Sequence, residues 1–384
     1  MRFAFFYHSL ISDWNHGNAH FLRGVVAELL DRGHQVRVFE PRDGWSITNL
    51  VEAHGPEAIE QFHRAFPGLE TTRYRLETLD LDRALDGVDV VLVHEWNPPE
   101  LVDRLGARRA AGAGFRLFFH DTHHRAVSDR ELIAAFDLDA YDGVLAFGES
   151  LRQRYLREGW EHQVWTWHEA ADTRVFHPRP DIETRRDLVW IGNWGDGERD
   201  AELREYFLEP AEDLDLETTV FGVRYPDHLL KEFRDHGIAF EGWVPNYRVP
   251  EVFGRHRATL HIPRRPYVDT LPGVPTIRVF EALACGIPLV CAPWRDVEDL
   301  FRPGTDYLVA EDGDEMAAHL RALHHDDAMA DELAARGLET IRERHTCAHR
   351  VDQLLGICRD LQVPAEDVSA RSPTPSTPAT EEQR

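Results

Sequence analysis

The chain has 384 residues, which is long for one compact core and suits two domains of about 150 to 200 residues each. It carries 43 Lys and Arg against 68 Asp and Glu, a formal charge of -25. This excess of negative charge repels the phosphates of nucleic acids and anionic membrane surfaces, so we expect no nucleic-acid partner. A local cluster of arginines or a helix N-terminus still binds a compact anion, so a nucleotide is not excluded.

The cysteines and the first residues bear on the location of the protein. Four cysteines occur without metal-like spacing, and we interpret them as reduced structural thiols: Cys285, Cys291, Cys347 and Cys358. The apolar start Met1–Leu10 is followed by no small-residue cleavage site. No apolar run approaches the roughly 18 residues that span a bilayer. We therefore expect a cytoplasmic protein without a transmembrane segment.

Short apolar runs alternate with helical patterns through the first half. The runs that predict buried strands are Arg2–His8, Gln35–Phe39, Val88–His94, Phe115–His120 and Gly143–Phe147. The first helix follows the first run, with an apolar stripe from Phe21 to Leu30, a predicted cap at Asn18 and a stop at Gly33. Alternation of this kind is typical of an α/β fold with a parallel, doubly wound sheet.

A polar stretch with two prolines, His177–Asp181, interrupts the pattern and predicts a linker. A second series of strands follows, at Leu188–Ile191, Thr218–Phe221, Ile238–Phe240, Ala258–Ile262, Pro288–Cys291 and Tyr307–Val309. From Gly313 to Leu361 the pattern is helical. We predict an acceptor-side domain at 1–177, a donor domain at 178–361 and a disordered tail at 362–384. Ligands of open α/β sheets bind at the carboxyl ends of the strands, which predicts a site in the cleft between the two domains.

The segment Leu271–Trp294 contains a loop that leads into a helix. Glycine permits a close backbone approach, and proline suits the first turn of a helix. The free amides and the dipole of the helix start favour a pyrophosphate, and Arg278 would add a charged hydrogen bond. The other positions predicted to bind the donor here are Gly273, Pro275, Thr276 and Ile277.

Within this segment Phe280–Val290, FEALACGIPLV, resembles the Glu-Ala-hydrophobic-Ala-x-Gly-x-Pro-Val block of the retaining GT-B glycosyltransferases of family 4. The chain is more closely similar to their spore-maturation, CgeB-like branch, over roughly Arg2 to Leu361. The resemblance implies a GT-B fold, with two Rossmann-like domains facing a cleft and a helical C-terminal segment. It also implies that Glu281 receives the ribose hydroxyls of the donor, and the alternative is an exposed salt bridge with Arg278.

The chain departs from the family at one place. Many relatives have a second glutamate eight positions before the first, near the transferred sugar, and here that position is Gly273. Either backbone amides position the sugar or catalysis is weak.

Further donor-side positions follow from the resemblance. Val189–Trp194 is similar to the first strand and glycine turn of the second domain, and Arg199 lies where relatives place a basic pyrophosphate contact. The alternative for Arg199 is a solvated side chain among acidic neighbours. A later turn resembles the segment that reads the nucleobase, with a packed tryptophan as its alternative. The residues implied are Gly192, Asn193, Gly242 and Trp243.

On the first half, the resemblance places His120, at the end of a strand, against the sugar or the acceptor, with Asp121 beside it. The loop that carries His16, Gly17 and Asn18 matches the family's N-terminal loop, and a simple turn and cap is the alternative. A nearby trio of histidines lacks a readable fourth ligand, so we expect no metal.

The sequence therefore predicts a glycosyltransferase that moves a sugar from a nucleotide-diphosphate sugar to an unidentified glycan or small-molecule acceptor, with retention and without a metal or cofactor. Catalytic roles are assigned to His120, Arg278 and Arg199. The alternative is a non-catalytic GT-B-like protein that binds a nucleotide sugar or glycan in surface or envelope assembly, which the missing glutamate favours. A dinucleotide dehydrogenase is disfavoured because Ser9–Gly17 contains no Gly-x-Gly-x-x-Gly.

Overall fold

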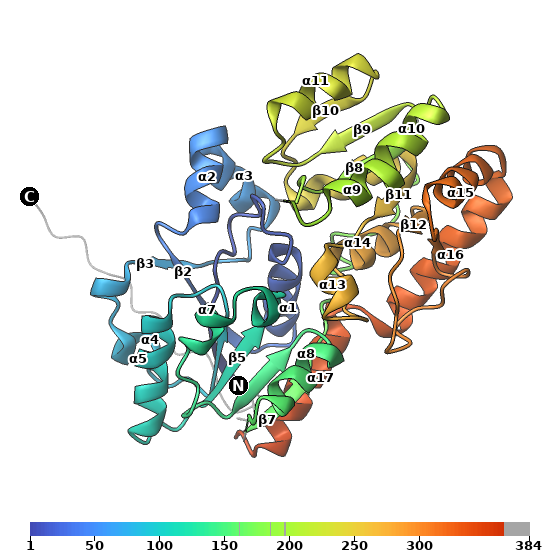
Figure 1. Cartoon of the computed structure of the whole chain (residues 1–384). Coiled ribbons are helices and arrows are strands. Elements are labelled where there is room, and N and C mark those ends of the chain that lie inside the picture. The colour runs from blue at the N-terminus through green and yellow to red at the C-terminus, as the bar shows by residue number, and fades with distance from the viewer. Residues whose placement is uncertain (161, 185, 196, 365–384) are drawn as a thin grey trace, which may run out of the picture.

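The computed structural model describes residues 1–160, 162–184, 186–195 and 197–364. The predicted disordered tail lies outside the described residues from position 365 onward. The described chain folds around two parallel sheets, one in each half, with helices on both faces of each (Figure 1).

The first sheet has seven parallel strands in the order β3-β2-β1-β4-β5-β6-β7. Their bounds are β1 Arg2–Phe6, β2 Gln35–Pro41, β3 Thr72–Tyr74, β4 Val90–His94, β5 Arg116–Asp121, β6 Gly143–Ala146 and β7 Gln163–Thr166. The five predicted strands are confirmed to within two residues at each end. The two missed strands, β3 and β7, are the short edges of the sheet, where burial on only one side weakens the apolar signal.

The second sheet has six parallel strands in the order β10-β9-β8-β11-β12-β13. Their bounds are β8 Arg186–Ile191, β9 Thr218–Phe221, β10 Ala239–Gly242, β11 His256–His261, β12 Leu289–Cys291 and β13 Leu308–Val309. Each predicted strand of this half is confirmed to within two residues. The predicted fold class, two doubly wound Rossmann-like halves with a helical C-terminal segment, is therefore confirmed.

Helices connect successive strands and cover both sheets. Those of the first half are α1 Ala19–Asp31, α2 Trp45–His54, α3 Glu57–Ala65, α4 Leu81–Ala84, α5 Pro99–Ala110, α6 Arg125–Ser128, α7 Arg130–Ala134 and α8 Glu149–Arg157. Those of the second half are α9 Asp200–Leu203, α10 Glu209–Asp213, α11 Asp227–Asp235, α12 Val249–Gly254, α13 Arg265–Asp269, α14 Ile277–Cys285, α15 Gly313–His325, α16 Asp327–Arg344 and α17 Cys347–Asp360. Short 3-10 turns lie at Leu76–Thr78 and Asn246–Arg248, and a π-turn at Arg204–Leu208.

One apolar core runs through both halves and joins α1, α14 and α17 to the facing sides of the two sheets. Two further cores fill the outer faces, one under each sheet. Because the inner core is continuous, the two halves pack directly on each other. The cleft edges of the two sheets are thereby held at a defined separation.

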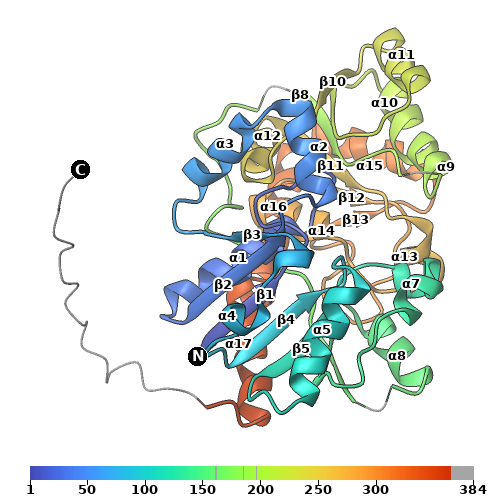
Figure 2. The same ribbon diagram turned by 90° about the vertical axis from the view of Figure 1, so that its left-hand side faces the viewer.

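The last helix, α17, returns to the first half (Figures 1 and 2). Trp167 donates its Nε1–H to the carbonyl of Arg350 at 2.9 Å. A Cβ atom on Gly24 of α1 would lie 2.4 Å from Sγ of Cys347, so the two helices touch without room for a side chain. The domain boundaries at 1–177 and 178–361 stay a prediction. Helix α17 packs against the first half, although it lies beyond residue 178 in the sequence.

Candidate functional site

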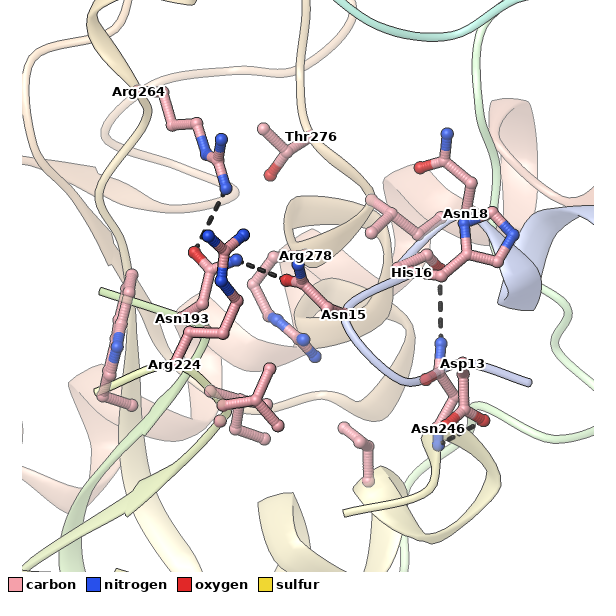
Figure 3. A pocket seen from close by; sticks show the side chains of 18 of the residues that line it. Asp13, Asn15, His16, Asn18, Asn193, Arg224, Asn246, Arg264, Thr276 and Arg278 are labelled. Carbon is pink, nitrogen blue, oxygen red and sulfur yellow. Dashed lines mark hydrogen bonds between the residues drawn. The ribbon is translucent and has the colours of Figure 1, made fainter. Parts of the chain in front are cut away.

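A cleft with a cavity of about 480 Å³ lies between the two halves (Figure 3). The first half lines it with the loop after β1 and with three aromatic side chains: Asp13, Asn15, His16, Gly17, Asn18, Trp45, Trp96 and His123. The second half lines it with the ends of β8, β9, β10 and β11 and with the start of α14. We call these two linings the first wall and the second wall.

Hydrogen bonds join the two walls across the cleft. Asp13 accepts from the indole N–H of Trp243 at 3.0 Å and from the backbone N–H of Asn246 at 3.1 Å. The same carboxylate pairs with Arg23 behind the first wall at 2.8 Å. Asn193 donates its side-chain amide to Oδ1 of Asn15 (Figure 3). The structure therefore shows the cleft with its walls in contact.

Four arginines line the second wall: Arg199, Arg224, Arg264 and Arg278. Arg199 donates to the carbonyls of Ile262 and Asn193, at 2.8 Å each. Burial, together with the charge of Arg264, lowers the pKa of Arg199 to about 10. Arg199 therefore remains a cation at neutral pH.

Arg264 and Arg278 are held by carboxylates. Arg264 pairs with Glu198 at 2.7 Å and also donates to Oδ1 of Asn193 at 3.2 Å. Arg278 forms an ion pair with Glu281 on the next turn of α14. Both guanidinium groups are oriented by these contacts, so the second wall presents fixed positive charge to the cleft.

The start of α14 lies in the cleft, as predicted, through Thr276, Ile277 and Arg278. Thr276 is the N-cap, and among the described residues its side chain accepts no capping hydrogen bond. The backbone N–H of Ile277 donates a hydrogen bond to the carboxyl group of Glu169. Burial raises the pKa of Glu169 well above its usual range, and the nearby Glu281 raises it further. One backbone amide at the start of α14 is therefore already bonded to Glu169, whose raised pKa favours the protonated carboxyl.

Gly273 and Pro275 lie behind this lining. Gly273 has a φ of +86°, and a Cβ atom there would lie 2.3 Å from Cγ2 of Val297. Position 273 therefore combines a left-handed backbone with an occupied side-chain space. No side chain fits at Gly273 unless Val297 moves.

Glu281 is fully buried and faces the first half instead of the cleft cavity. His20 of α1 accepts a hydrogen bond from the backbone N–H of Asp172 at Nε2, so its proton is on Nδ1 and is donated to Glu281 at 3.0 Å. The alternative prediction of an exposed pair with Arg278 is wrong, because the pair exists but is buried. The ribose role of Glu281 stays a prediction.

His120 lies beneath the first wall, with no exposed surface. Its ring centroid is 4.8 Å from that of Trp167 and 5.4 Å from that of His94. Burial lowers the pKa of His120 to about 3. Asp121 is also fully buried and accepts from the Tyr155 hydroxyl at 2.8 Å. The structure separates both residues from the cleft lining, and their assigned roles stay predictions.

The remaining predicted residues divide in the same way. The cleft lining includes Gly192, Asn193, Trp243, His16, Gly17 and Asn18, whereas Gly242 lies outside it. Asn18 stands at the N-cap of α1, but across the described chain its side chain makes no capping hydrogen bond. Its amide instead donates to Oγ1 of Thr122 at 2.6 Å, so the predicted side-chain cap is wrong.

Sequence reasoning missed several residues of the cleft lining: Trp45, Trp96, Arg224, His261 and Arg264. His261 and Arg264 had a readable signal, because they follow the predicted strand Ala258–Ile262 and the ends of parallel strands meet at one edge. Trp96 likewise follows β4. Trp45 and Arg224 lie beyond longer turns, so strand ends alone do not indicate them.

Two features are absent from the described residues. No group of three or more His, Cys, Asp or Glu side chains in the described part of the chain has an arrangement that could hold a metal ion. Within the described ranges, no helix has the length and apolar character required to cross a bilayer.

Known proteins share this architecture. The family described as glycosyl transferase-like matches residues 199–356, and no curated protein is recognisably similar in sequence. Sucrose-phosphate synthase from Thermosynechococcus elongatus has a similar structure, with a TM-score of 0.65 and 14% identity over 94% of this chain and 99% of that one. Anabaena Alr3699/HepE in complex with UDP-glucose also has a TM-score of 0.65, with 12% identity over 94% of this chain and 100% of the other. A glycosyltransferase from Rickettsia africae has a TM-score of 0.63 and 11% identity over 95% and 99%. The fold is therefore that of the GT-B glycosyltransferases.

Proposed function

We propose that this chain is a glycosyltransferase that moves a sugar from a nucleotide-diphosphate sugar to a glycan or small-molecule acceptor. We place it in the family 4 type and its CgeB-like branch, with retention of configuration and without a metal. The observation that carries the proposal is the second wall. There, four arginines and the start of α14 line a cavity of about 480 Å³.

The chemistry of the transfer explains this wall. When the bond between sugar and diphosphate breaks, negative charge develops on the departing diphosphate. Oriented cations and backbone amides stabilise that charge without having to rearrange. Arg199, Arg264 and Arg278 are oriented in this way, and the Arg charges supply the stabilisation that other enzymes obtain from a metal ion. The names of several similar structures include UDP, which makes UDP-sugars the first donors to test.

Glu281 is proposed to receive the ribose, and Trp243 and Gly242 to contact the base. In the described state Glu281 is bonded to His20 of the first half. Its ribose role therefore requires that the halves separate and His20 release the carboxylate before the donor enters. Bonds between Asp13 and Trp243 would then re-form over the bound nucleotide.

The acceptor is proposed to lie on the first wall, which offers amides, imidazoles and indoles beside the Asp13 carboxylate that is paired with Arg23. His16, Asn18, Trp45 and Trp96 line it. His120 does not reach the cleft as described, so its proposed role is to position the wall through its neighbour His94. Asp121 is proposed to act in the same way through its own β5–α6 loop.

The alternative is a protein that binds a nucleotide sugar or glycan without turning it over. It is favoured by Gly273, where the glutamate of relatives is replaced and Val297 fills the space. In that case the second wall retains the ligand, and no carboxylate at this place contacts the sugar.

Thermal unfolding in the presence of a panel of nucleotide sugars tests both. Binding followed by release of the nucleoside diphosphate, with a broad acceptor panel, supports the transferase. Binding without release supports the alternative, and absence of any binding contradicts both. Turnover that survives EDTA supports the metal-independent mechanism, and the anomeric configuration of the product, read by NMR, tests retention.

A further inference from the structure

One histidine of the second wall is in an unusual state. His261 ends β11 and lines the cleft, yet only 3% of its surface is exposed. Within the described residues, both of its ring nitrogens lack a hydrogen-bond partner. A buried polar group without a partner costs about 1 to 3 kcal/mol. Because His261 also lines the cleft, a ligand bound there is placed to pair with it.

Two neighbouring groups share this state. The Nε–H of Arg199 and the Nε–H of Arg278 are also buried without an acceptor among the described residues. Both arginines line the cleft, and the positive charge of each lowers the pKa of His261. An arginine Nε–H only donates hydrogen bonds, so the three residues together offer donors and need an acceptor. A phosphate group consists of acceptor oxygens and meets this need.

The protonation of His261 fits the same ligand. Burial, together with the charges of Arg199 and Arg278, lowers the pKa of His261 to about 3. At neutral pH the ring is therefore uncharged and carries one N–H. That N–H donates to an anion without adding a charge that would repel the two neighbouring arginines.

We propose that His261 is a donor-binding residue whose N–H is donated to the diphosphate of the nucleotide sugar, beside Arg199 and Arg278. This inference rests on the proposed function and assigns one more contact to it. His261 is thus a residue for binding the leaving group, placed in the second wall at the end of β11.

A second histidine on the same strand provides a control. His256 begins β11 and lies outside the cleft lining. Its Nδ1 is bonded to the carbonyl of Val252 at 2.7 Å and its Nε2 to Oγ1 of Thr219 at 3.0 Å. The two histidines therefore share strand and burial but differ in whether the protein itself satisfies their nitrogens.

The experiment compares His261→Phe with His256→Phe in the full chain, using UDP as the probe. His261→Phe removes an unsatisfied polar group, so we expect an unchanged or higher melting temperature and a Kd for UDP raised about 10- to 150-fold, the range for a hydrogen bond to a charged group. His256→Phe breaks two hydrogen bonds, so we expect a lower melting temperature and a Kd within about twofold of the unmodified protein. His261→Gln retains an N–H donor and should recover most of the affinity.

The outcomes separate the inference from the proposed function. If the unmodified protein binds no nucleoside diphosphate, the proposed function fails and the inference with it. If the unmodified protein binds UDP and His261→Phe binds it within twofold, the inference alone is overturned. A loss seen with UDP-glucose but not with UDP assigns the contact to the sugar and overturns the diphosphate assignment. If His261→Phe does not fold, equal affinities of His261→Gln and a folded His261→Leu overturn it.

Discussion

The two walls of the cleft differ in how they present polar groups. The described first wall has no Lys or Arg in its lining. It is built from indoles, amides and neutral imidazoles, and its carboxylate, Asp13, is paired with Arg23 behind the wall. The second wall presents four arginines to the same cavity. Both are edges of the same kind of parallel sheet, so the fold does not dictate the difference. The side chains at the strand ends decide which wall receives an anion and which receives an uncharged partner.

The difference extends behind the walls. Behind the first wall lie buried carboxyls, of which Glu95 forms an ion pair with Arg125. Arg125 in turn lies over the Trp96 ring, with its guanidinium carbon 3.9 Å from the ring centroid. The charge of Arg125 is therefore neutralised inside the protein by Glu95, and its guanidinium group packs under the aromatic surface of Trp96. On the second wall the arginines reach the cleft, where charge is available to a ligand.

The largest expected effect tests the first wall through pH. Six histidines in and behind it have a lowered pKa, chiefly because of burial: His8, His16, His94, His120, His123 and His124. Below a pH of about 6.5 the unfolded chain binds protons that the folded chain excludes, so the free energy of unfolding falls as pH falls. Each histidine contributes about 1.4 kcal/mol per pH unit once its unfolded form titrates. Denaturant unfolding at pH 7.5, 6.5 and 5.5 measures the slope.

Two carboxyls of the same region act in the opposite direction. Burial raises the pKa of Glu95 to about 8 and that of Asp121 to about 6, although Arg125 lowers both. Their contribution to stability is present at low pH and is lost as pH rises through these values. Other groups act on the same measurement, because burial also lowers the pKa of His256, His261 and His345 and raises that of Glu40, Glu169 and Asp296. Among the described residues the histidines with a lowered pKa still outnumber the carboxyls with a raised one, so we expect a net loss of several kcal/mol between pH 7.5 and 5.5. A constant free energy of unfolding over this range would contradict the assignment of neutral, buried histidines.

The second prediction tests the charge of the second wall with two adjacent arginines. Arg264 lines the cleft, whereas Arg265 pairs with Glu202 on the surface at 2.7 Å. Arg264→Gln should raise the Kd for UDP about 10- to 150-fold, because it replaces a charged donor to phosphate by a neutral one. Arg265→Gln makes the same chemical change away from the cleft and should stay within about twofold. Calorimetric titration of both variants decides, and equal losses would indicate a general effect of net charge.

The sequence predicts some residues of the two walls and not others. The strands and the start of α14 follow from local apolar patterns, and so do Arg199 and Arg278 near their ends. The burial of His120 does not, because it depends on Trp167, a residue 47 positions later that packs on its ring. Similarly, Glu281 was read from its own helix, while its partner His20 belongs to α1. Contacts between distant segments decide which strand-end residues face the cleft, and periodicity carries no information on them.

The third prediction concerns Glu281, which joins the two walls from behind. Glu281→Gln keeps an oxygen for the Nδ1–H of His20 but removes the charge that pairs with Arg278. We expect the free energy of unfolding to fall by about 1 to 3 kcal/mol, because the pair is buried. Denaturant unfolding measures this loss. If Glu281 also receives the ribose, affinity for UDP falls while affinity for inorganic pyrophosphate does not. Equal losses for both ligands would instead indicate that the substitution acts only through Arg278.

The smallest expected effect concerns the bond between Asn193 and Asn15, which links the walls across the cleft. Arg199 and Arg264 donate to Oδ1 of Asn193, at 3.1 and 3.2 Å, and an arginine cannot accept, so the amide orientation of Asn193 is fixed with its NH₂ toward Asn15. The cationic wall thereby holds the donor of the link in place. Asn15 itself has a φ of +49°, a conformation that glycine and asparagine adopt more easily than alanine.

Asn15→Gly therefore removes the link while keeping the backbone conformation. A neutral hydrogen bond contributes about 0.5 to 1.5 kcal/mol, so the closed state should become about 2- to 12-fold less favoured. A ligand that contacts both walls binds only the closed state, so its affinity falls by the same factor as the population of that state. The affinity of a ligand that contacts a single wall does not change. We expect a 2- to 12-fold higher Kd for a UDP-sugar, since its nucleotide contacts groups that meet only on closure, and an unchanged Kd for inorganic pyrophosphate. Asn15→Asp keeps an acceptor oxygen for Asn193 and serves as the control. If pyrophosphate affinity falls as much as that of the UDP-sugar, the link organises the arginines of the second wall and does not govern closure.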